Sequence, residues 1–270
     1  MEVRPATEGD WDGITAVAEL VGQGGEGGGG DRRYLRHVMG VGRLGVAVAS
    51  GDVVGYVASR QVGAADMLCD LFVHADHRGR GVGRALLACA WGDAPHRQTF
   101  SSLDPSALPL YVRSGMTPRW PLLYLSGDVG TLPRAEGLTV SGVEAATASS
   151  VEEQLTGVDR EADYRYWSAR PSGTSLVVTR RGEPVAAGAV GGEGRGFGVS
   201  HLYAATGDAE PLLAVLGWLS GRAVVTVPGP HPAVPALIGA GWRNEYTDIY
   251  LATDEALIDA DRLCPHPGLA

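Results

Sequence analysis

Residues 78–84 place three arginines around a glycine-rich turn, Arg78-Gly79-Arg80-Gly81-Val82-Gly83-Arg84. An apolar, strand-forming run precedes this turn, and apolar residues at helical spacing follow it to Trp91. A helix that starts directly after such a turn has free backbone N–H groups in its first turn, and its dipole favours an anion there. Glycine lets the backbone approach the anion, and the arginines add positive charge. We therefore predict that this turn binds a diphosphate group.

Side chains that could move a proton lie close to the turn. Asp66 and Asp70 lie on the preceding strand an even number of residues apart, so we expect them on one face of the sheet. His74 and His77 are nearer the turn, and histidine titrates near neutral pH. Each has an ordinary alternative: a solvated carboxylate or an arginine partner for Asp70, and a surface position for each histidine.

The elements around the turn follow one order from residue 1 to about residue 128. Asp10 and Asp31 are expected to cap the first two helices. The segment between those helices, Gly22–Asp31, is so rich in glycine that we expect either a surface linker or a mobile loop beside a substrate site. Strands are expected at 2–5, 44–49, 53–60, 66–74, 98–103 and 120–126, with helices before residue 40, after Gly83 and after Asp104.

Two motifs in this stretch resemble those of the GNAT superfamily of N-acetyltransferases. Arg-x-x-Gly-x-Gly, at Arg78, Gly81 and Gly83, resembles the loop that binds the pyrophosphate of acetyl-CoA. The segment Asp104-x-x-Ala107-x-x-x-Tyr111-x-x-x-Gly115-Met116 resembles the family's second motif, with Asp in place of Asn and Met in place of Phe. The alternatives for the first motif are a simple tight turn and a Rossmann dinucleotide loop, although the latter usually follows the first strand of its domain.

The resemblance implies a role for each group of residues. Acetyl-CoA is the implied acyl donor, held by residues 78–84 and by Phe72 and Val73 at the end of the preceding strand. In the family, the backbone there pairs with the pantetheine arm and polarises the thioester carbonyl. Tyr111 is the implied general acid for the leaving thiolate, with simple packing at the end of a helix as the alternative. Because the family often places an acid on this strand, Asp70 is our first choice for the general base.

The same order of elements repeats after a linker at 127–137. Several identities recur at an offset of 126 residues, including Pro109 with Pro235, Gly115 with Gly241 and Tyr124 with Tyr250. We therefore predict an α/β (α+β) protein with two tandem GNAT-like domains, each a mixed, mostly antiparallel sheet flanked by helices. The predicted bounds are 1–128 for the acetyl-CoA-binding domain, 137–254 for a degenerate second domain and 255–270 for a tail.

The offset also indicates what the second copy lacks. It aligns Arg78, Arg80 and Arg84 with Ala204, Thr206 and Glu210, Val82 with Asp208, and Tyr111 with Leu237. Two carboxylates at a diphosphate position would repel it. We predict that the second copy does not bind acetyl-CoA and instead shapes the acceptor pocket of the first. Its segment 159–167 mixes acids with aromatics, which is typical of an amine pocket or of an amphipathic helix that packs Tyr164 and Trp167 inward.

The composition limits the partners. A net charge of −9 argues against nucleic acid or an anionic membrane as the main partner. No stretch approaches the roughly 18 apolar residues of a membrane span, and the charged N-terminus does not resemble a signal peptide, so we expect a cytoplasmic protein. The three cysteines have no metal-like spacing, and we expect no metal.

These observations predict an acyltransferase. We expect an acetyl-CoA-dependent N-acetyltransferase that transfers acetyl directly to the amine of a small molecule and works as a monomer or homodimer. Two alternatives stay open: a non-catalytic acyl-CoA-binding or sensor protein, and an enzyme of the same fold with other acyl chemistry, such as O-acylation or malonyl decarboxylation.

Overall fold

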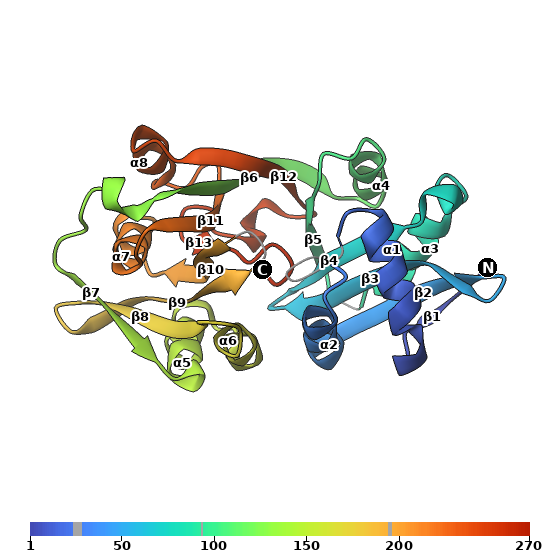
Figure 1. Cartoon of the computed structure of the whole chain (residues 1–270), viewed down its shortest axis with the longest axis horizontal. Helices are drawn as coiled ribbons and strands as arrows, with labels where there is room; N and C mark the ends of the chain where they lie inside the picture. The colour runs from blue at the N-terminus through green and yellow to red at the C-terminus, as the bar shows by residue number, and fades with distance from the viewer. Residues whose placement is uncertain (24–28, 93, 194–195) are drawn as a thin grey trace. The chain divides into compact units, whose positions relative to one another are not determined.

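A computed structural model describes residues 1–23, 29–92, 94–193 and 196–270 (Figure 1). Contacts divide the chain into two compact units, one of residues 1–118 with 251–257 and one of residues 119–250 with 258–270. Of the glycine-rich segment at 22–31, residues 24–28 lie outside the described part of the chain.

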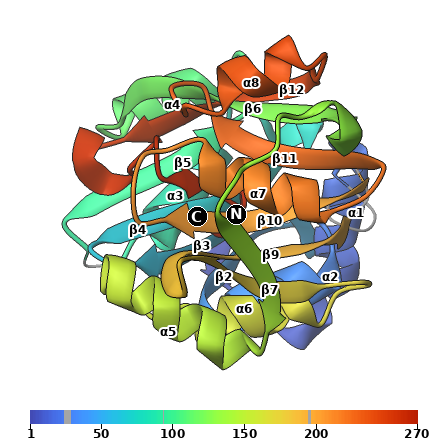
Figure 2. The same cartoon turned by 90° about the vertical axis from the view of Figure 1, so that its left-hand side faces the viewer.

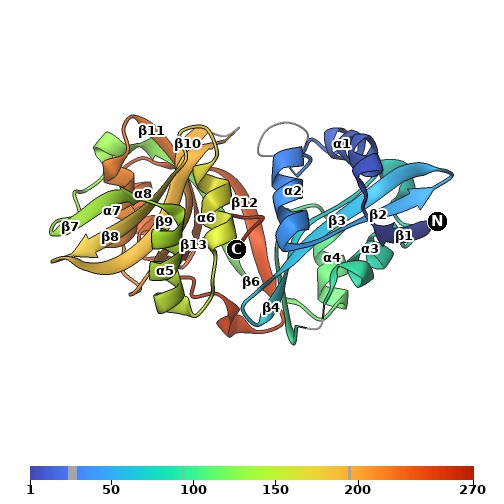
Figure 3. The same ribbon diagram turned by 90° about the horizontal axis from the view of Figure 1, so that it is seen from below.

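The first unit is a sheet with helices on both sides. Its strands follow the order β1-β2-β3-β4-β5, and all neighbours are antiparallel except β4 and β5, which are parallel. Figure 3 shows α1 and α2 on one side of this sheet and α3 and α4 on the other. The elements are β1 (Glu2–Pro5), α1 (Trp11–Leu20), α2 (Arg32–Val41), β2 (Gly42–Ala49), β3 (Asp52–Val62), β4 (Ala65–Val73), α3 (Val82–Ala90), β5 (His96–Ser101) and α4 (Ala107–Arg113).

Polar side chains fix the starts of the first two helices. The carboxylate of Asp31 accepts a hydrogen bond from the N–H of Arg33 at 2.8 Å and caps α2, as predicted. Asp10 is the N-cap residue of α1, at the predicted position, but its side chain makes no cap hydrogen bond to the helix. Its carboxylate instead accepts two hydrogen bonds from Arg4, each 2.8 Å long, and this bonding lowers the pKa of Asp10. Asp10 therefore fastens β1 to the beginning of α1.

A bulge interrupts β4 at Cys69. Leu68 pairs with Ser59 and Asp70 with Ala58, so Cys69 is an extra residue on β4. A bulge reverses the alternation of side chains beyond it. The Asp66 carboxylate accepts a hydrogen bond from the N–H of Gly92, just after α3, at 2.6 Å, whereas Asp70 is hydrogen-bonded to Tyr34 on α2. The two aspartates thus face opposite sides of the sheet, and the prediction that they share a face is wrong.

The second unit repeats this arrangement. Its strands follow the order β12-β6-β11-β10-β9-β8-β7, with β13 paired to β10. Figure 2 shows α5 and α6 on one side of these strands and α7 on the other. The elements are β6 (Thr117–Asp128), β7 (Leu138–Val143), α5 (Ala145–Thr156), α6 (Glu161–Ser168), β8 (Thr174–Arg180), β9 (Glu183–Glu193), β10 (Gly196–Ala204), α7 (Glu210–Trp218), β11 (Arg222–Pro228), α8 (Val234–Gly239), β12 (Arg243–Ala252) and β13 (Leu263–Cys264).

The division by contacts differs from the predicted bounds of 1–128 and 137–254. Residues 122–128 of β6 pair with β11 of the second unit. Residues 251–257 belong to the first unit, where Thr253 exchanges hydrogen bonds with Arg97 of β5: Thr253 N–H donates to Arg97 O at 2.9 Å and Arg97 N–H to Thr253 Oγ1 at 3.0 Å. The first unit therefore takes residues 251–257 from the far end of the sequence, whereas most of β6, which was predicted to close the first domain, belongs to the second unit.

The offset between the repeats is not constant. After α4 and α8 it is 126: Met116 N–H donates to Tyr111 O at 3.2 Å, and Trp242 N–H donates to Leu237 O at 3.1 Å. On β4 and β10 it is 131, because the bulge that sets Asp70 opposite Ala58 recurs with His201 opposite Ala189. Eight residues join β4 to α3, but only five join β10 to α7. Ala204, which the constant offset aligned with Arg78, is instead the counterpart of Val73.

Candidate functional site

An unpaired strand edge lies at the end of β4. The parallel register of β4 with β5 covers only Ala65–Leu68 against His96–Thr99, although β4 continues to Val73 and β5 to Ser101. Beyond Leu68 the described registers give β4 no partner on its β5 side. An extended molecule can pair with such an edge by main-chain hydrogen bonds. Phe72 and Val73, which sequence analysis assigned to the acyl-donor arm, lie on this edge.

The first turn of α3 follows directly. Gly81 is the N-cap residue, with φ 85°, and no side chain caps the helix. The first N–H groups of an uncapped helix have no partner within the helix. Gly79 also has a positive φ, 72°, and no described heavy atom lies within 4 Å of where a Cβ would stand at Gly79 or Gly81. The turn is therefore open above the helix N-terminus, which fits a diphosphate group.

Arginine side chains surround this N-terminus. Arg78 Nε donates to the carbonyl of Val73 at 3.1 Å, which ties the turn to the end of β4. Arg78 Nη1 also lies 3.5 Å from Asp104 Oδ2. Hydrogen bonds from Ser106, aided by Arg78, keep the pKa of Asp104 low. Arg80 and Arg84 are exposed, so their guanidinium groups are accessible to an anion.

Asp70 lies on the α2 side of the sheet with one oxygen buried. Its Oδ2 has no hydrogen-bond partner among the described residues, and neither has the buried hydroxyl of Tyr56. Burial raises the pKa of Asp70 to about 7, against the opposing effect of the hydrogen bond with Tyr34. A Cβ at Gly29 would lie 2.8 Å from Asp70 Oδ1 and 2.7 Å from the Phe72 ring, so only glycine fits there. A carboxyl group that is half ionised near neutral pH is suited to proton transfer.

Tyr111 lies on α4 and is only 6% exposed. The residue before it places α4 beside the turn, because a Cβ at Gly83 would meet Leu110 at 3.5 Å and Val73 at 3.8 Å. The end of β4, the start of α3 and the helix that carries Tyr111 thus meet in one place.

The other candidates near the turn have structural contacts. Asp66 holds Gly92 and lies 3.7 Å from Arg43. His74 accepts a hydrogen bond from the N–H of Asp76 at 3.2 Å, and its ring meets that of His77 edge-on at 5.8 Å. Sequence reasoning assigned neither Tyr34 nor Tyr56 to the site, because a tyrosine in an apolar pattern carries no sign of its hydroxyl partner.

In the second unit, the described loop before α7 differs from the turn before α3. The loop from Ala205 to Ala209 contains no arginine, and a Cβ at Gly207 would stand 2.2 Å from the carboxylate of Asp261. Glu210, at the start of α7, forms an ion pair with Arg180. On α6, Tyr164 and Trp167 are fully buried, in agreement with the amphipathic alternative.

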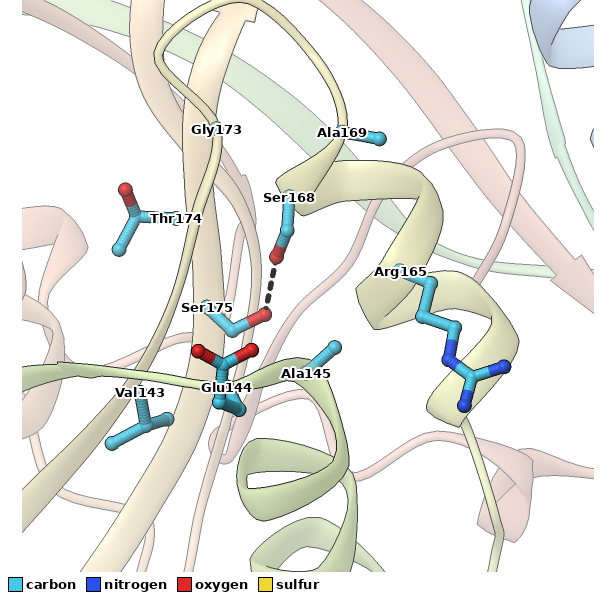
Figure 4. A pocket seen from close by; sticks show the side chains of 9 residues that line it. All are labelled: Val143, Glu144, Ala145, Arg165, Ser168, Ala169, Gly173, Thr174 and Ser175. Carbon is cyan, nitrogen blue, oxygen red and sulfur yellow. Dashed lines mark hydrogen bonds between the residues drawn. The ribbon is translucent and has the colours of Figure 1, made fainter.

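A hollow of about 400 Å³ lies in the second unit where β8 begins beside α6 (Figure 4). The hydroxyls of Ser168 and Ser175 are 2.6 Å apart in it, and Glu144 and Arg165 also line it. None of the residues predicted for catalysis or acetyl-CoA binding lines it.

Comparison with known proteins agrees with this geometry. Residues 40–115 match the family model of the acetyltransferase (GNAT) domain. No curated protein matches the chain. Solved structures with the same fold include a putative acetyltransferase from Pyrococcus horikoshii (13% identity, TM-score 0.73, 98% of this chain and 93% of that chain covered). Others are a GCN5-related N-acetyltransferase from Kribbella flavida (16%, 0.63, 93% and 70%) and a tandem GNAT protein from the clavulanic acid biosynthesis pathway (13%, 0.60, 96% and 99%).

Residues 40–115 match the acetyltransferase (GNAT) domain, and the whole chain has the fold of solved GNAT proteins, one of them a tandem GNAT protein, so the resemblance found in the sequence is confirmed. The fold supports acyl transfer. Among the described helices, none has both the length and the apolarity of a membrane span.

Proposed function

We propose that this protein is an N-acetyltransferase that uses acetyl-CoA to acetylate the amine of a small molecule, with its site in the first unit. The observation that carries the proposal is the continuity of two open features. The unpaired edge of β4 ends at Val73, and the uncapped N-terminus of α3 begins nine residues later at Val82. A ligand with an extended arm attached to a diphosphate would fit both features, with the arm along the edge of β4 and the diphosphate at the N-terminus of α3.

The donor contacts follow from this placement. The main chain at Phe72 and Val73 would bind the pantetheine arm, and the N–H groups of Val82, Gly83 and Arg84 would bind the diphosphate. Arg78, Arg80 and Arg84 add charge-assisted hydrogen bonds, which are roughly twice as strong as neutral ones. Gly79 and Gly81 hold the turn in a conformation that other residues rarely adopt.

Acetyl-CoA supplies a thioester carbonyl and a thiolate leaving group. In the proposed reaction, the N–H of Val73 donates to the carbonyl oxygen and stabilises the charge that develops there. Asp70 accepts the proton that the attacking amine loses, and its raised pKa suits that transfer. The hydroxyl of Tyr111 donates a proton to the departing sulfur. A new C–N bond forms as the C–S bond breaks.

The net charge of −9 and the carboxylate of Asp70 favour a cationic or amine-bearing acceptor over an acidic one. The experiment incubates the protein with acetyl-CoA and a panel of amines and measures released thiol. Release that requires an amine supports the proposal. Binding without release would indicate a non-catalytic acyl-CoA-binding or sensor protein, and turnover of malonyl-CoA or of an alcohol acceptor would indicate other acyl chemistry.

A further inference from the structure

The second unit contains the counterpart of the opening between β4 and β5, and the chain itself occupies it. Strand β10 pairs with β11 only at Gly198 and Val199, although β10 continues to Ala204. Beyond Val199, β13 pairs with β10, with Leu202 opposite Cys264 and Tyr203 opposite Leu263 (Figure 1). An extended segment therefore lies against the strand edge that is unpaired in the first unit.

One further contact matches a contact at the first opening, and a second bonds the segment to the other strand. Arg262 Nε donates to the carbonyl of Ala204, the last residue of β10, at 2.9 Å. In the first unit Arg78 Nε donates in the same way to Val73, the last residue of β4, at 3.1 Å. On the opposite side of the opening, Thr226 of β11 donates its hydroxyl proton to the carbonyl of Pro265. The segment is thus bonded to both strands that form the opening.

The segment continues over the position that corresponds to Asp70. That position holds His201, whose Nε2 lies 3.0 Å from both oxygens of Glu152, while its buried Nδ1 has no hydrogen-bond partner in the described part of the chain. The ring of Trp167 stacks on His201 at 4.8 Å, and the ring of His266 lies 6.2 Å from Trp167. Arg160 donates to the carbonyl of Leu269, and Leu269 is fully buried.

We infer that residues 258–270 act as a tethered ligand of the second unit, and that the ligand class this unit binds is an extended peptide segment. The parallel with an acyl-donor arm rests on the proposed function; the occupation of the second opening does not. Side chains anchor the segment: Leu263 is 6% exposed, and Cys264 is 1% exposed, with its sulfur 3.8 Å from His231. Asp208, Glu210 and Asp261 near the loop favour a peptide over a diphosphate.

The experiment separates the segment from the folded protein. A protease site inserted between Leu257 and Ile258 of the full chain is cut after folding, the released peptide is removed, and a labelled synthetic peptide of residues 258–270 is added back. We expect it to bind, as measured by fluorescence anisotropy. A peptide with Cys264→Asp should bind at least tenfold more weakly, because it buries a carboxylate. The matched control, Ala260→Asp, introduces the same group at a less buried position and should bind within about threefold of the original peptide.

Three results would overturn the inference. The cut protein could lose its far-ultraviolet circular dichroism when the peptide leaves and not recover it on re-addition, which would make the segment part of the core. The peptide could fail to rebind to folded, cut protein. The Cys264→Asp and Ala260→Asp peptides could bind equally well. None of these measurements uses acetyl-CoA, so they stay interpretable whether or not the first unit transfers acetyl groups.

Discussion

At the residue scale, the proposed role of Tyr111 as general acid can be tested by a single substitution. A phenylalanine fits the same buried volume, so Tyr111→Phe should leave the fold and the CoA dissociation constant nearly unchanged. Loss of a general acid should lower kcat by about 10²-fold or more. Steady-state kinetics and calorimetric CoA binding measure the two quantities. Tyr246→Phe, at a side chain 39% exposed in the second unit, is the control and should change neither. An unchanged kcat in Tyr111→Phe would remove this residue from the mechanism.

Asp70 should give the protein a stability that depends on pH. Burial raises its pKa to about 7 in the folded state, whereas an unfolded aspartate titrates near pH 3.9. Between those values the folded state keeps a proton that the unfolded chain loses, so this group lowers the free energy of unfolding as pH rises from about 4 to about 7. Asp70→Asn removes that term. Urea unfolding at pH 5 and pH 8 should show the variant gaining stability relative to the wild type at the higher pH.

Asp70 should also determine how the activity depends on pH. If Asp70 is the general base, kcat/KM should rise through an apparent pKa near 7 as the carboxyl ionises, and Asp70→Asn should lose that limb and most of the rate. Asp76→Asn, at a side chain 84% exposed near the same strand end, is the matched control and should keep the profile. A pH profile that is the same in Asp70→Asn and the wild type would assign the base to another residue.

Asp104 competes with the donor for Arg78. Their charged atoms are 3.5 Å apart and both side chains are partly exposed, so the ion pair contributes at most about 1 kcal/mol. Asp104→Asn keeps an acceptor for the Ser106 N–H, frees Arg78 and removes a negative charge beside the proposed diphosphate. We expect CoA to bind about two- to fivefold more tightly, with the gain shrinking at high salt. Weaker binding measured by calorimetry would contradict this placement of the diphosphate.

Sequence rules predicted contacts between residues close together in the chain, but they missed contacts that depend on the position of another strand. Asp31 caps its helix through a contact two residues away, which sequence spacing captures. The partner of Asp10 is Arg4 on a separate strand, and that contact depends on where β1 lies. The relative orientation of Asp66 and Asp70 also depends on another strand. Strict alternation holds along a regular strand, but an inserted residue at Cys69 is fixed by the pairing partner β3 and leaves no mark in β4 itself.

At the scale of elements, the role of Gly83 in the first turn of α3 can be tested by substitution. Gly83→Ala is tolerated by the fold, since its Cβ would make only ordinary contact at 3.5 Å with Leu110. Alanine should raise helix stability by up to about 1 kcal/mol and still weaken CoA binding roughly tenfold, because the methyl group keeps the diphosphate from the backbone. The measurements are the melting temperature and calorimetric affinity.

Gly217 in α7 offers the matched control. No described heavy atom lies within 4 Å of where its Cβ would stand, so Gly217→Ala should give a similar stability gain with CoA affinity unchanged. Equal affinities in both variants would argue that residues 82–84 do not contact the diphosphate.

The element order was predictable, but the lengths of the connections were not. Apolar periodicity indicated most of the strands and helices in sequence order, because burial imposes that periodicity. A constant offset of 126 then misaligned the loop, since the β10–α7 connection is shorter than the β4–α3 connection. The two-residue strand β13 is too short for any periodicity and exists only because β10 offers it an edge.

At the scale of the whole molecule, the two units differ in what they can bind. Calorimetric titration of the intact protein with CoA should give one site per chain, because among the described residues only the first unit has an uncapped helix that directly follows a glycine turn containing arginines. The double variant Arg80→Ala with Arg84→Ala should weaken that binding by at least about tenfold, given two charge-assisted contacts. Two tight sites in the wild type, or a strong site remaining in the variant, would place the donor in the second unit.

The sequence predicted two copies of one fold, and that is confirmed. It gave no sign that β6 and the end of β12 would pair as they do. Two strands with the same apolar pattern at equivalent positions can occupy the same place in a sheet, and only the folded arrangement decides between them.

The exchange of strand ends has a consequence for how this chain is made. Thr253 supplies hydrogen bonds to Arg97, so the first unit is completed by residues that leave the ribosome only after nearly the entire second half has been synthesised. During synthesis, Arg97 on β5 therefore lacks its Thr253 partner until residue 253 has been made. An uncovered strand edge favours aggregation, and a contact between residues so far apart in the chain forms slowly. Expressed alone, residues 1–128 would lack Thr253 and with it both of its hydrogen bonds to Arg97.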